Sequence, residues 1–374
     1  MAFFALGVGT ASIGAALPDL RRVFDLGSTG GNTLVSAYSL GALIAIVTCG
    51  ALRTRLRATT AMAVLLAVYV VGASAMGLAP TWTGFYAATP ITGLGYGGLV
   101  LYLNSIVARR FAHRSFLMLM LVNAVYGLGA IVGPLIVGID HARPQTVFVI
   151  SAAIAILSAP MCGMGREPSR ADIPTRPTIA ATTTSARARV PLRVRIHSIV
   201  PFLVFGFFYA GMETGTGAWE STHLTWTGHS TSEAAKFAAL FWAGLCVGRF
   251  VLPFVIRDRS PRIIIRVALS AALFTFAAAA APAVTPYAYT LSGFCLAPVL
   301  PAVLQWVAQR VEDNQAANSM VLTASMAGSV ALPSAIGQLA TPDTPAAIPL
   351  FLVVFALAGL ITTFLAGETI GASG

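Results

Sequence analysis

The segment 202–226, FLVFGFFYAGMETGTGAWESTHLTW, is apolar enough to cross a bilayer, yet it carries Glu213 at its centre and Glu220 near its end. A charged residue at the centre of a membrane helix costs roughly 2.5–3.5 kcal/mol on insertion scales, so it usually faces a bundle interior or a water-filled cavity. At 100° per residue, one stripe of this helix carries Tyr209, Glu213, Thr216 and Glu220. The segment predicts a polar helix lining a cavity among many membrane helices. The alternative is a protonated, hydrogen-bonded Glu213 with a structural role only.

The composition of the whole chain indicates a membrane protein. Of its 374 residues, 57% are hydrophobic and only 10% are charged, whereas soluble domains carry about 25% charged residues. The net charge of +10 does not indicate a nucleic-acid partner, because nearly all basic residues lie in short gaps between apolar runs. The four cysteines lie within or at the ends of apolar runs, so we expect small buried side chains rather than disulfides or metal ligands.

Apolar runs of about the length of a membrane helix recur along the chain. They span 2–20, 30–51, 59–79, 83–107, 114–138, 144–164, 199–221, 233–256, 261–282, 286–308, 314–339 and 345–366. One long gap, 165–197, is rich in Pro, Thr and Arg and predicts a flexible linker. The predicted fold is an all-α polytopic membrane protein with twelve transmembrane helices, a six-helix bundle at 1–164, a cytoplasmic linker at 165–197 and a six-helix bundle at 198–374.

The first apolar run lacks a basic segment ahead of it, so it does not resemble a cleavable signal. It is also at the short limit for a span, which leaves two alternatives: a start upstream of residue 1, or a helix that continues past Pro18. The orientation follows from the basic residues in the gaps. The linker and the gaps on its side of the membrane hold 17 of them, against 4 in the other gaps. The positive-inside rule therefore places the linker and both termini in the cytoplasm.

The two halves of the sequence also resemble each other. Arg110 and Arg310 follow similar segments at an offset of 200, and Pro134 and Pro333 lie in similar segments at an offset of 199. A near-constant offset across separate helices indicates a duplicated six-helix unit. Internal repeats of this kind are typical of secondary transporters, whose substrate sites lie near the membrane midplane between the repeats.

This pattern of six plus six helices with a basic linker resembles the major facilitator superfamily along the whole chain. The superfamily has a loop signature, G-x-x-x-D-R-x-G-R-R, after helices two and eight. In the family these charges form a cytoplasmic latch between the halves through ion pairs and helix-end dipoles. The resemblance assigns that role here to Gly50, Arg55, Asp258, Arg259 and Arg262. Thr54 stands where the first copy of the signature has its acid.

The second half is most similar to the fucose-type sugar symporters. The similarity lies in GMETGTGAW (211–219) and FWAGLCVGR (241–249). Those symporters carry a coupling carboxylate inside helix one, where this chain has no acid before Asp19, so that role is not transferred. Glu213 is the only acid near a helix centre and is our candidate for coupling to a cation, with H⁺ preferred to Na⁺ because one central carboxylate is visible. A direct pair between Glu213 and Arg249 is compatible with the sequence but not required by it.

A sugar site needs paired donors and acceptors together with a flat aromatic face. Side chains of these types in the apolar runs are our candidates for substrate binding: Asn32, Tyr38, Asn104, Asn123, Tyr126, Tyr209, Trp219, Glu220, Trp242, Arg249, Gln305, Trp306 and Asn318. The alternative for each is a polar contact that joins neighbouring helices. The glycine tract 93–98 mimics a dinucleotide loop, but it lies inside a spanning run, and we expect it to serve helix packing.

We therefore expect a monomeric secondary active transporter of a cell inner membrane that takes up a sugar-like solute with a cation by alternating access. The alternative is a proton-antiporting exporter of drugs or metabolites, because Gly129, Gly133 and Pro134 resemble part of the exporter motif of the superfamily. An enzyme is disfavoured, since the five histidines show no metal-ligand spacing. We expect the bilayer, a small solute and H⁺ or Na⁺ as partners, with no cofactor, metal or nucleic acid.

Overall fold

The computed structural model describes residues 1–52, 57–110, 115–139, 143–160, 192–256, 259–310 and 314–368. Within these ranges the regular secondary structure is helical, and no strand occurs. Nine of the described helical segments are long and apolar enough to cross a membrane, and three shorter apolar helices accompany them. The prediction of an all-α polytopic membrane protein is confirmed.

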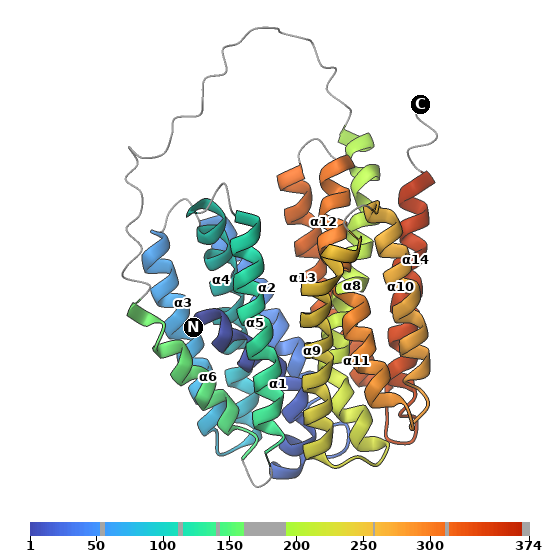
Figure 1. Ribbon diagram of the computed structural model, residues 1–374. Helices are drawn as coiled ribbons and strands as arrows, with labels where there is room; N and C mark the ends of the chain where they lie inside the picture. The colour runs from blue at the N-terminus through green and yellow to red at the C-terminus, as the bar shows by residue number, and fades with distance from the viewer. Residues whose placement is uncertain are drawn as a thin grey trace, which may run out of the picture.

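The helices of the first half are α1 (Ala2–Val23), α2 (Leu34–Leu52), α3 (Ala58–Leu78), α4 (Trp82–Arg110), α5 (Ser115–Val137) and α6 (Thr146–Ile156). Those of the second half are α8 (Leu192–Trp226), α9 (Thr231–Ile256), α10 (Pro261–Ala278), α11 (Thr285–Leu296), α12 (Val299–Arg310), α13 (Asn314–Leu339) and α14 (Ala347–Glu368). The two halves stand side by side in Figure 1, with α1 to α6 on one side and α8 to α14 on the other.

Three elements differ from the sequence prediction. The run predicted as one helix at 286–308 is divided into α11 and α12, with Pro298 between them. Proline has no N–H to donate and its ring clashes with the preceding turn, so the helix is interrupted there. Helix α8 begins at Leu192, inside the range predicted as linker, because its helical turns continue beyond the apolar run. Helix α1 passes through Pro18 and ends at Val23, so it continues past this proline.

The surface of the bundle is apolar, as a lipid-facing surface must be. Large side chains on the outer helices are mostly exposed, such as Phe254 at 81%, Phe274 at 72% and Leu78 at 72%. Helix α1 is different, because nearly all of its residues are buried. It packs against α5 and α6 of its own half and against α8 and α9 of the other half. It is therefore an interior helix at the contact between the halves.

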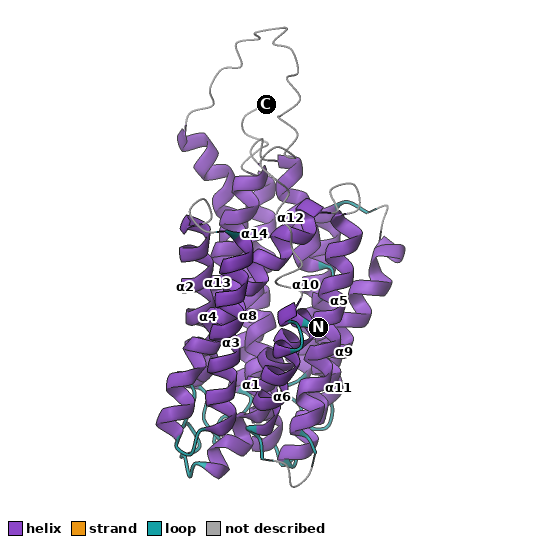
Figure 2. Cartoon of the chain, turned by 90° about the vertical axis from the view of Figure 1, so that its left-hand side faces the viewer, coloured by secondary structure: helices purple, strands orange, loops and turns teal. Residues whose placement is uncertain are grey.

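The halves meet mainly through α1 with α8, α2 with α13, and α5 with α9, and α1 also contacts α9. We call the end of the bundle at which α8 begins the linker end, and the end at which α1 stops and α2 starts the distal end. The linker end is uppermost in Figures 1 and 2, and the distal end is lowermost. Near the distal end the halves approach closely, because a Cβ atom added at Gly14 of α1 would overlap the backbone of Gly217 on α8.

The glycine tract of α4 serves helix packing, as expected. A Cβ atom at Gly93 or Gly97 would meet the backbone of α2, and one at Gly95 would meet the backbone of α3. Side chains on this face of α4 would push the neighbouring helices away. The tract brings α2, α3 and α4 together, and it places Tyr96, which lies within it, beside Tyr38 of α2 with ring centroids 5.3 Å apart.

Candidate functional site

An ion pair joins α8 and α9 in the middle of the molecule. The Arg249 guanidinium donates from Nη2 to Oε1 of Glu213 at 3.3 Å, and the two side chains are 28% and 17% exposed. Tyr209, one turn before Glu213 on α8, donates its hydroxyl to Oε2 of the same carboxylate at 2.5 Å. The spacing of four residues puts Tyr209 and Glu213 on one face of the helix. The pair that the sequence left open is thus present.

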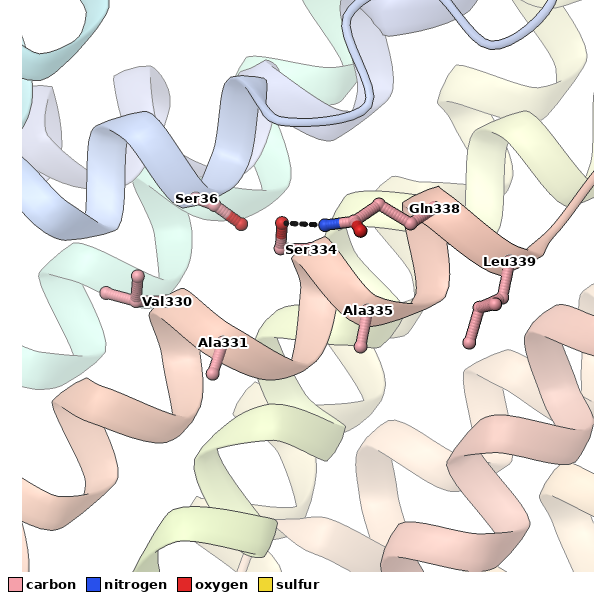
Figure 3. A pocket seen from close by; sticks show the side chains of 7 residues that line it. All are labelled: Ser36, Val330, Ala331, Ser334, Ala335, Gln338 and Leu339. Carbon is pink, nitrogen blue, oxygen red and sulfur yellow. Dashed lines mark hydrogen bonds between the residues drawn. The ribbon is translucent and has the colours of Figure 1, made fainter.

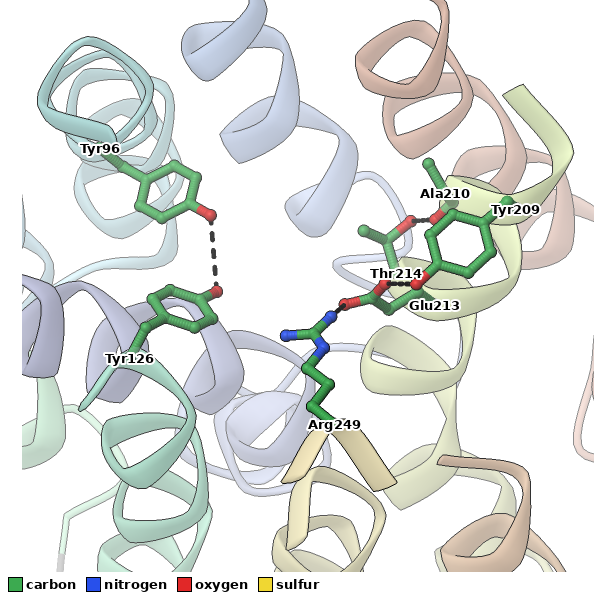
Figure 4. Close-up of polar contacts among 7 residues, drawn as sticks. All are labelled: Tyr96, Tyr126, Tyr209, Ala210, Glu213, Thr214 and Arg249. Atoms are coloured by element: carbon green, nitrogen blue, oxygen red, sulfur yellow. Dashed lines mark hydrogen bonds and ion pairs between the residues drawn. The ribbon is translucent and has the colours of Figure 1, made fainter. Parts of the chain in front are cut away.

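Tyrosines of the first half face this ion pair. Figure 4 shows Arg249 with Tyr96 and Tyr126 on one side of it and with Glu213 and Tyr209 on the other. The hydroxyl oxygens of Tyr96 on α4 and Tyr126 on α5 lie 3.5 Å apart.

Tyr38 on α2 packs against Tyr96, with the ring centroids 5.3 Å apart. Its hydroxyl lies 2.8 Å from Oγ1 of Thr10 on α1, so hydroxyl groups of four different helices of the first half meet around this point. We call Tyr38, Tyr96, Tyr126, Tyr209, Glu213 and Arg249 the central cluster.

The central cluster combines one carboxylate, one guanidinium and several hydroxyl groups. Glu213 and Arg249 are partly exposed, whereas Tyr38 and Tyr209 are buried. Each tyrosine hydroxyl can donate and accept a hydrogen bond, and the guanidinium offers up to five N–H donors. The aromatic faces can stack on an apolar face of a small molecule. The carboxylate can take up a proton, which would release the guanidinium for other acceptors. These are the groups needed to bind a polyhydroxylated solute and a proton at one place.

Sequence reasoning selected four of these six residues as binding candidates and Glu213 as the coupling residue, and it missed Tyr96. Thr10, which holds the Tyr38 hydroxyl, was missed as well. Tyr96 lies in a tract that was assigned to packing as a whole. The flanking Gly95 and Gly97 could have indicated it. Between two residues without side chains, Tyr96 is the one large side chain that projects from that part of the helix.

A second group of contacts joins the halves at the distal end. Arg21 at the end of α1 is only 7% exposed. It donates to Gly30 O at 2.8 Å, to Asn32 Oδ1 at 2.9 Å and to Thr222 Oγ1 of α8 at 3.2 Å. Its guanidinium carbon also lies 5.9 Å and 5.8 Å from the ring centroids of Trp219 and Trp226. We call Arg21 and these partners the distal contact.

Two further hydrogen bonds close the same end. The Asn32 amide donates to the carbonyl oxygen of Gly337 on α13. Ser232 at the start of α9 donates to Gly138 O, after α5, at 2.7 Å. These hydrogen bonds and that of Arg21 with Thr222 join the two halves at the distal end. In the sequence analysis Arg21 was only one of the basic residues in the gaps. It is buried because α1 continues beyond Pro18 and carries it into the contact between the halves.

Several predicted binding residues lie elsewhere than in the central cluster. Asn32 precedes α2 rather than lying on it, because α2 starts only at Leu34. Trp219 donates from Nε1 to Pro333 O at 2.9 Å and belongs to the distal contact. Trp306 packs edge-on against Phe202 with centroids 5.0 Å apart.

The remaining polar candidates are spread over four helices. Asn104 donates to Val100 O of its own helix at 2.9 Å. Asn123 is exposed on α5, and Gln305 is exposed on α12. The side chain of Asn318 lies outside the described residues.

Two candidates of the second half are buried and lack hydrogen-bond partners in the described part of the chain. Glu220 is 0% exposed, and neither of its carboxyl oxygens has a partner. Trp242 is 7% exposed, and its Nε1 has no partner either. The ring of Trp242 packs against Phe241 with centroids 5.3 Å apart. Neither residue is placed at the ion pair that Arg249 forms.

Of the residues expected in the cytoplasmic latch, Gly50, Arg259 and Arg262 are described and belong to the linker end. Arg55 and Asp258 are not described. Gly50 is exposed, and a Cβ atom there would have no neighbour within 4 Å. Arg259 is exposed. Arg262 lies over the ring of Trp306, with its guanidinium carbon 5.5 Å from the centroid.

A cavity of about 420 Å³ lies in the seam between α2 and α13, apart from the central cluster. Figure 3 shows Ser36 of α2 facing Ser334 and Gln338 of α13 across it. The Gln338 amide donates to Ser334 Oγ at 3.3 Å. None of the predicted binding residues lines this cavity.

Comparison with known proteins places this geometry in a family. Residues 1–333 match the family model of the Major Facilitator Superfamily. Bypass of stop codon protein 6 of Saccharomyces cerevisiae is 23% identical over 276 residues. That alignment covers 68% of this chain and 55% of the yeast protein, so the chain spans about half the length of this relative.

Solved structures similar to this one are transporters. A D-xylose–proton symporter superposes with a TM-score of 0.78 at 15% identity, covering 99% of this chain and 95% of the other. A bacterial homologue of the human lysosomal transporter Spinster gives 0.77 at 16% identity, covering 99% and 96%. The fucose–proton symporter of E. coli gives 0.64 at 18% identity, covering 98% and 96%. At these identities the likeness shows the fold, which is the fold that the sequence resemblance predicted.

Proposed function

Because this chain belongs to the Major Facilitator Superfamily, and is thus a membrane transporter rather than an enzyme, we propose that it takes up a sugar-like solute together with a proton by alternating access. In this mechanism the first and second halves rock against each other around the central cluster, and a solute bound there is exposed first on one side of the membrane and then on the other. Sites between the halves and near the midplane are typical of such transporters.

The observation that carries the proposal is the contact of Glu213 with Arg249 and Tyr209, which lies within the second half and faces the tyrosines of the first half. While Glu213 is ionised, it holds the guanidinium and the tyrosine hydroxyl. A proton on the carboxyl oxygen removes the negative charge and weakens both contacts. Arg249 and Tyr209 then become free to bind a solute. Proton binding and solute binding are coupled in this way by one carboxyl group.

The nature of the side chains favours a polyhydroxylated solute. Tyr38, Tyr96 and Tyr126 bring hydroxyl groups and ring faces from the first half, and Arg249 adds N–H donors from the second. A solute with many hydroxyl groups offers a partner to each of them. The sugar and proton specificity of the D-xylose and fucose symporters agrees with this assignment.

We further propose that the protein is a monomer in a cell inner membrane. The distribution of basic residues in the gaps supports an orientation with the linker end in the cytoplasm. Gly50, Arg55, Asp258, Arg259 and Arg262 then belong to the cytoplasmic latch. The distal contact faces the outside, so the hydrogen bonds of Arg21 and Asn32 close the outer side in this conformation.

Uptake into proteoliposomes tests the proposal. A panel of radiolabelled pentoses, hexoses and nucleosides is offered under an imposed inward proton gradient, an inward sodium gradient, or neither. We expect one class of sugar to accumulate only with the proton gradient. Glu213→Gln should abolish this accumulation while exchange of labelled for unlabelled solute continues, because exchange requires no net proton movement.

The other outcomes of this panel are equally informative. Accumulation by Glu213→Gln at the rate of the unmodified protein would remove Glu213 from the coupling. Accumulation driven by sodium alone would replace the proton. If protons that enter the vesicles drive preloaded solute out of them, and no condition gives uptake, the protein is the exporter instead.

A further inference from the structure

Glu220 is the second acid of α8, and its surroundings differ from those of Glu213. It follows Glu213 by seven residues, or roughly 10 Å along the helix axis at 1.5 Å per residue. It is 0% exposed, and within the described part of the chain neither carboxyl oxygen accepts or donates a hydrogen bond. Glu213, in contrast, is partly exposed and bound to Arg249 and Tyr209. The mechanism proposed for Glu213 makes no use of Glu220.

The faces of α8 show where Glu220 points. Thr222 and Trp226 contact Arg21 and therefore face α1 and the first half, while Trp219 contacts both Arg21 and Pro333 O of α13. Glu220 and His223 lie one turn apart on a different face. His223 is 1% exposed, and its Nδ1 lies 2.9 Å from the hydroxyl of Tyr289 on α11, which is 0% exposed. Glu220 therefore belongs to the interior of the second half, on the side of α8 that faces α11.

No basic group of the neighbouring helices is arranged to neutralise an ionised Glu220. From α1, Arg21 is held by the distal contact, and Asp19 is paired with Arg22 at 2.7 Å. On α9, Arg249 is paired with Glu213, Glu233 caps the helix start by accepting from Ser230, and the Lys236 side chain lies near Gly138.

The other helices that pack on α8 add no nearby charge. Helix α13 has no charged residue, and α12 and α14 carry theirs, Arg310 and Glu368, at the linker end. The titratable neighbours of Glu220 on its own side of α8 are therefore His223 and Tyr289.

We propose that Glu220 is a second proton-binding site, occupied by a proton in this conformation, and that His223 with Tyr289 forms the path by which this proton exchanges. An ionised carboxylate without a cation or donor is strongly disfavoured in an apolar interior, whereas a neutral carboxyl group is tolerated. A bound metal ion does not fit, because hard cations need several oxygen ligands and no group of three His, Cys, Asp or Glu occurs among the described residues.

The proton transfer involves two residues of α8, Glu220 as the donor and His223 as the acceptor. Because neither Glu220 oxygen is hydrogen-bonded to a described residue in this conformation, the transfer requires a rotation of its side chain or one bridging water. The O–H bond of the carboxyl group then breaks and the proton passes to the His223 imidazole, leaving a carboxylate and an imidazolium three residues apart on the same helix. Opposite charges at this spacing attract each other. The imidazole can then release a proton from its other nitrogen. His229, partly exposed after the end of α8, follows His223 by six residues, and its Nδ1 lies 3.2 Å from Leu224 O.

The occupancy of Glu220 by a proton is independent of any solute, and only its use in transport rests on the function proposed above. Infrared spectra of the full-length protein in proteoliposomes measure this occupancy directly. We expect a carbonyl band of a protonated carboxyl group at neutral pH that shifts in D₂O. Glu220→Gln should remove this band, and the matched variant Glu213→Gln should retain it.

Several results would overturn the inference. One is the absence of such a band in the unmodified protein, and another is its persistence in Glu220→Gln. If Glu220→Gln does not fold, Glu220→Asp moves the carboxyl group by one methylene and must shift the band. Loss of the band when potassium is replaced by sodium at constant pH would assign a cation to the site instead of a proton.

The exchange path has its own measurement. His223→Gln and Tyr289→Phe should slow the D₂O shift of the band by roughly tenfold or more, because a proton relay is interrupted. Unchanged exchange in both variants would exclude this path. Failure of every solute in the uptake panel would contradict the proposed transport function but would leave these spectra, and the conclusion about Glu220, unaffected.

Discussion

Two arginines lie between the halves of this transporter, and they are bound in different ways. Arg249 is partly exposed and pairs with a carboxylate, that of Glu213. Arg21 is buried at the distal end, and its partners are a carbonyl oxygen, an amide oxygen, a hydroxyl group and two indole rings. Every partner of Arg21 is neutral, whereas the main partner of Arg249 can gain or lose a charge.

The difference shows which contact can respond to a proton. Separating Arg249 from an ionised Glu213 leaves two unpaired charges in a poorly hydrated space, which is costly unless the acid is first protonated. Separating Arg21 from its partners leaves one cation that water can hydrate once the end opens. The middle of the molecule is therefore sensitive to protonation, and the distal end is held by contacts whose strength does not depend on an acid. Four experiments test this comparison, from the largest expected effect to the smallest.

Replacement of Arg249 by Ala should have the largest effect, because it leaves Glu213 without its cation. We expect loss of coupled uptake and a decrease of about 1–3 kcal/mol in the free energy of unfolding, below the 3–5 kcal/mol typical of fully buried pairs, since both side chains are partly exposed. The double variant Arg249→Ala/Glu213→Gln should regain most of this stability. SDS titration in mixed micelles measures both variants. A double variant as unstable as the single one would show that the two charges are not coupled.

Gly14→Val should force the halves apart at the distal end, because its Cβ would overlap the backbone of Gly217 on α8. Overpacking of this kind costs about 1–3 kcal/mol. We expect faster maleimide labelling of a cysteine introduced at Thr222, in a background without the native cysteines. Gly27→Val is the control, since a Cβ there meets nothing within 4 Å. Equal labelling of the two variants would contradict the close contact of α1 with α8.

Arg21→Gln and Arg22→Gln compare neighbouring arginines in opposite environments. Arg21 loses buried hydrogen bonds and two ring contacts, so we expect a decrease of about 2 kcal/mol in the free energy of unfolding. Arg22 is 75% exposed in its pair with Asp19, and we expect a change of about 0–1 kcal/mol. The loss in Arg21→Gln should be similar at acidic and neutral pH, since its partners are neutral. A loss that disappears on acidification would show that a carboxylate contributes to the distal contact.

Tyr209→Phe should have the smallest effect of the four and should still exceed that of Tyr126→Phe. The Tyr209 hydroxyl donates to a carboxylate at 2.5 Å, whereas that of Tyr126 is 3.5 Å from the hydroxyl of Tyr96. Hydrogen bonds to charged groups contribute about 1.5–3 kcal/mol when buried, and contacts near 3.5 Å contribute little. We expect a loss of about 1 kcal/mol for Tyr209→Phe and a few tenths for Tyr126→Phe in the same titration. A larger loss for Tyr126→Phe than for Tyr209→Phe would show that the hydroxyl contact of Tyr126 is the stronger one.

Much of the fold was available from the sequence. The apolar runs predicted the membrane helices, because the thickness of a bilayer fixes the length of a span. The corrections concern the broken helix at Pro298 and the positions at which several helices begin and end. The acid in the middle of a span identified Glu213 as a residue of the interior, since lipid does not accept it. Both inferences depend only on one helix and the lipid around it, so they could be made without knowing which helices are its neighbours.

The partners of these residues were decided by the tertiary structure. Glu213 and Arg249 lie 36 positions apart, and Arg21 and Thr222 lie 201 apart. Whether such side chains meet depends on the depth and rotation of each helix against its neighbours, which the periodicity of one helix does not specify. Packing therefore gave one acid of α8 an arginine and left the other, Glu220, without a hydrogen-bond partner among the described residues, although the sequence presents both on the same stripe.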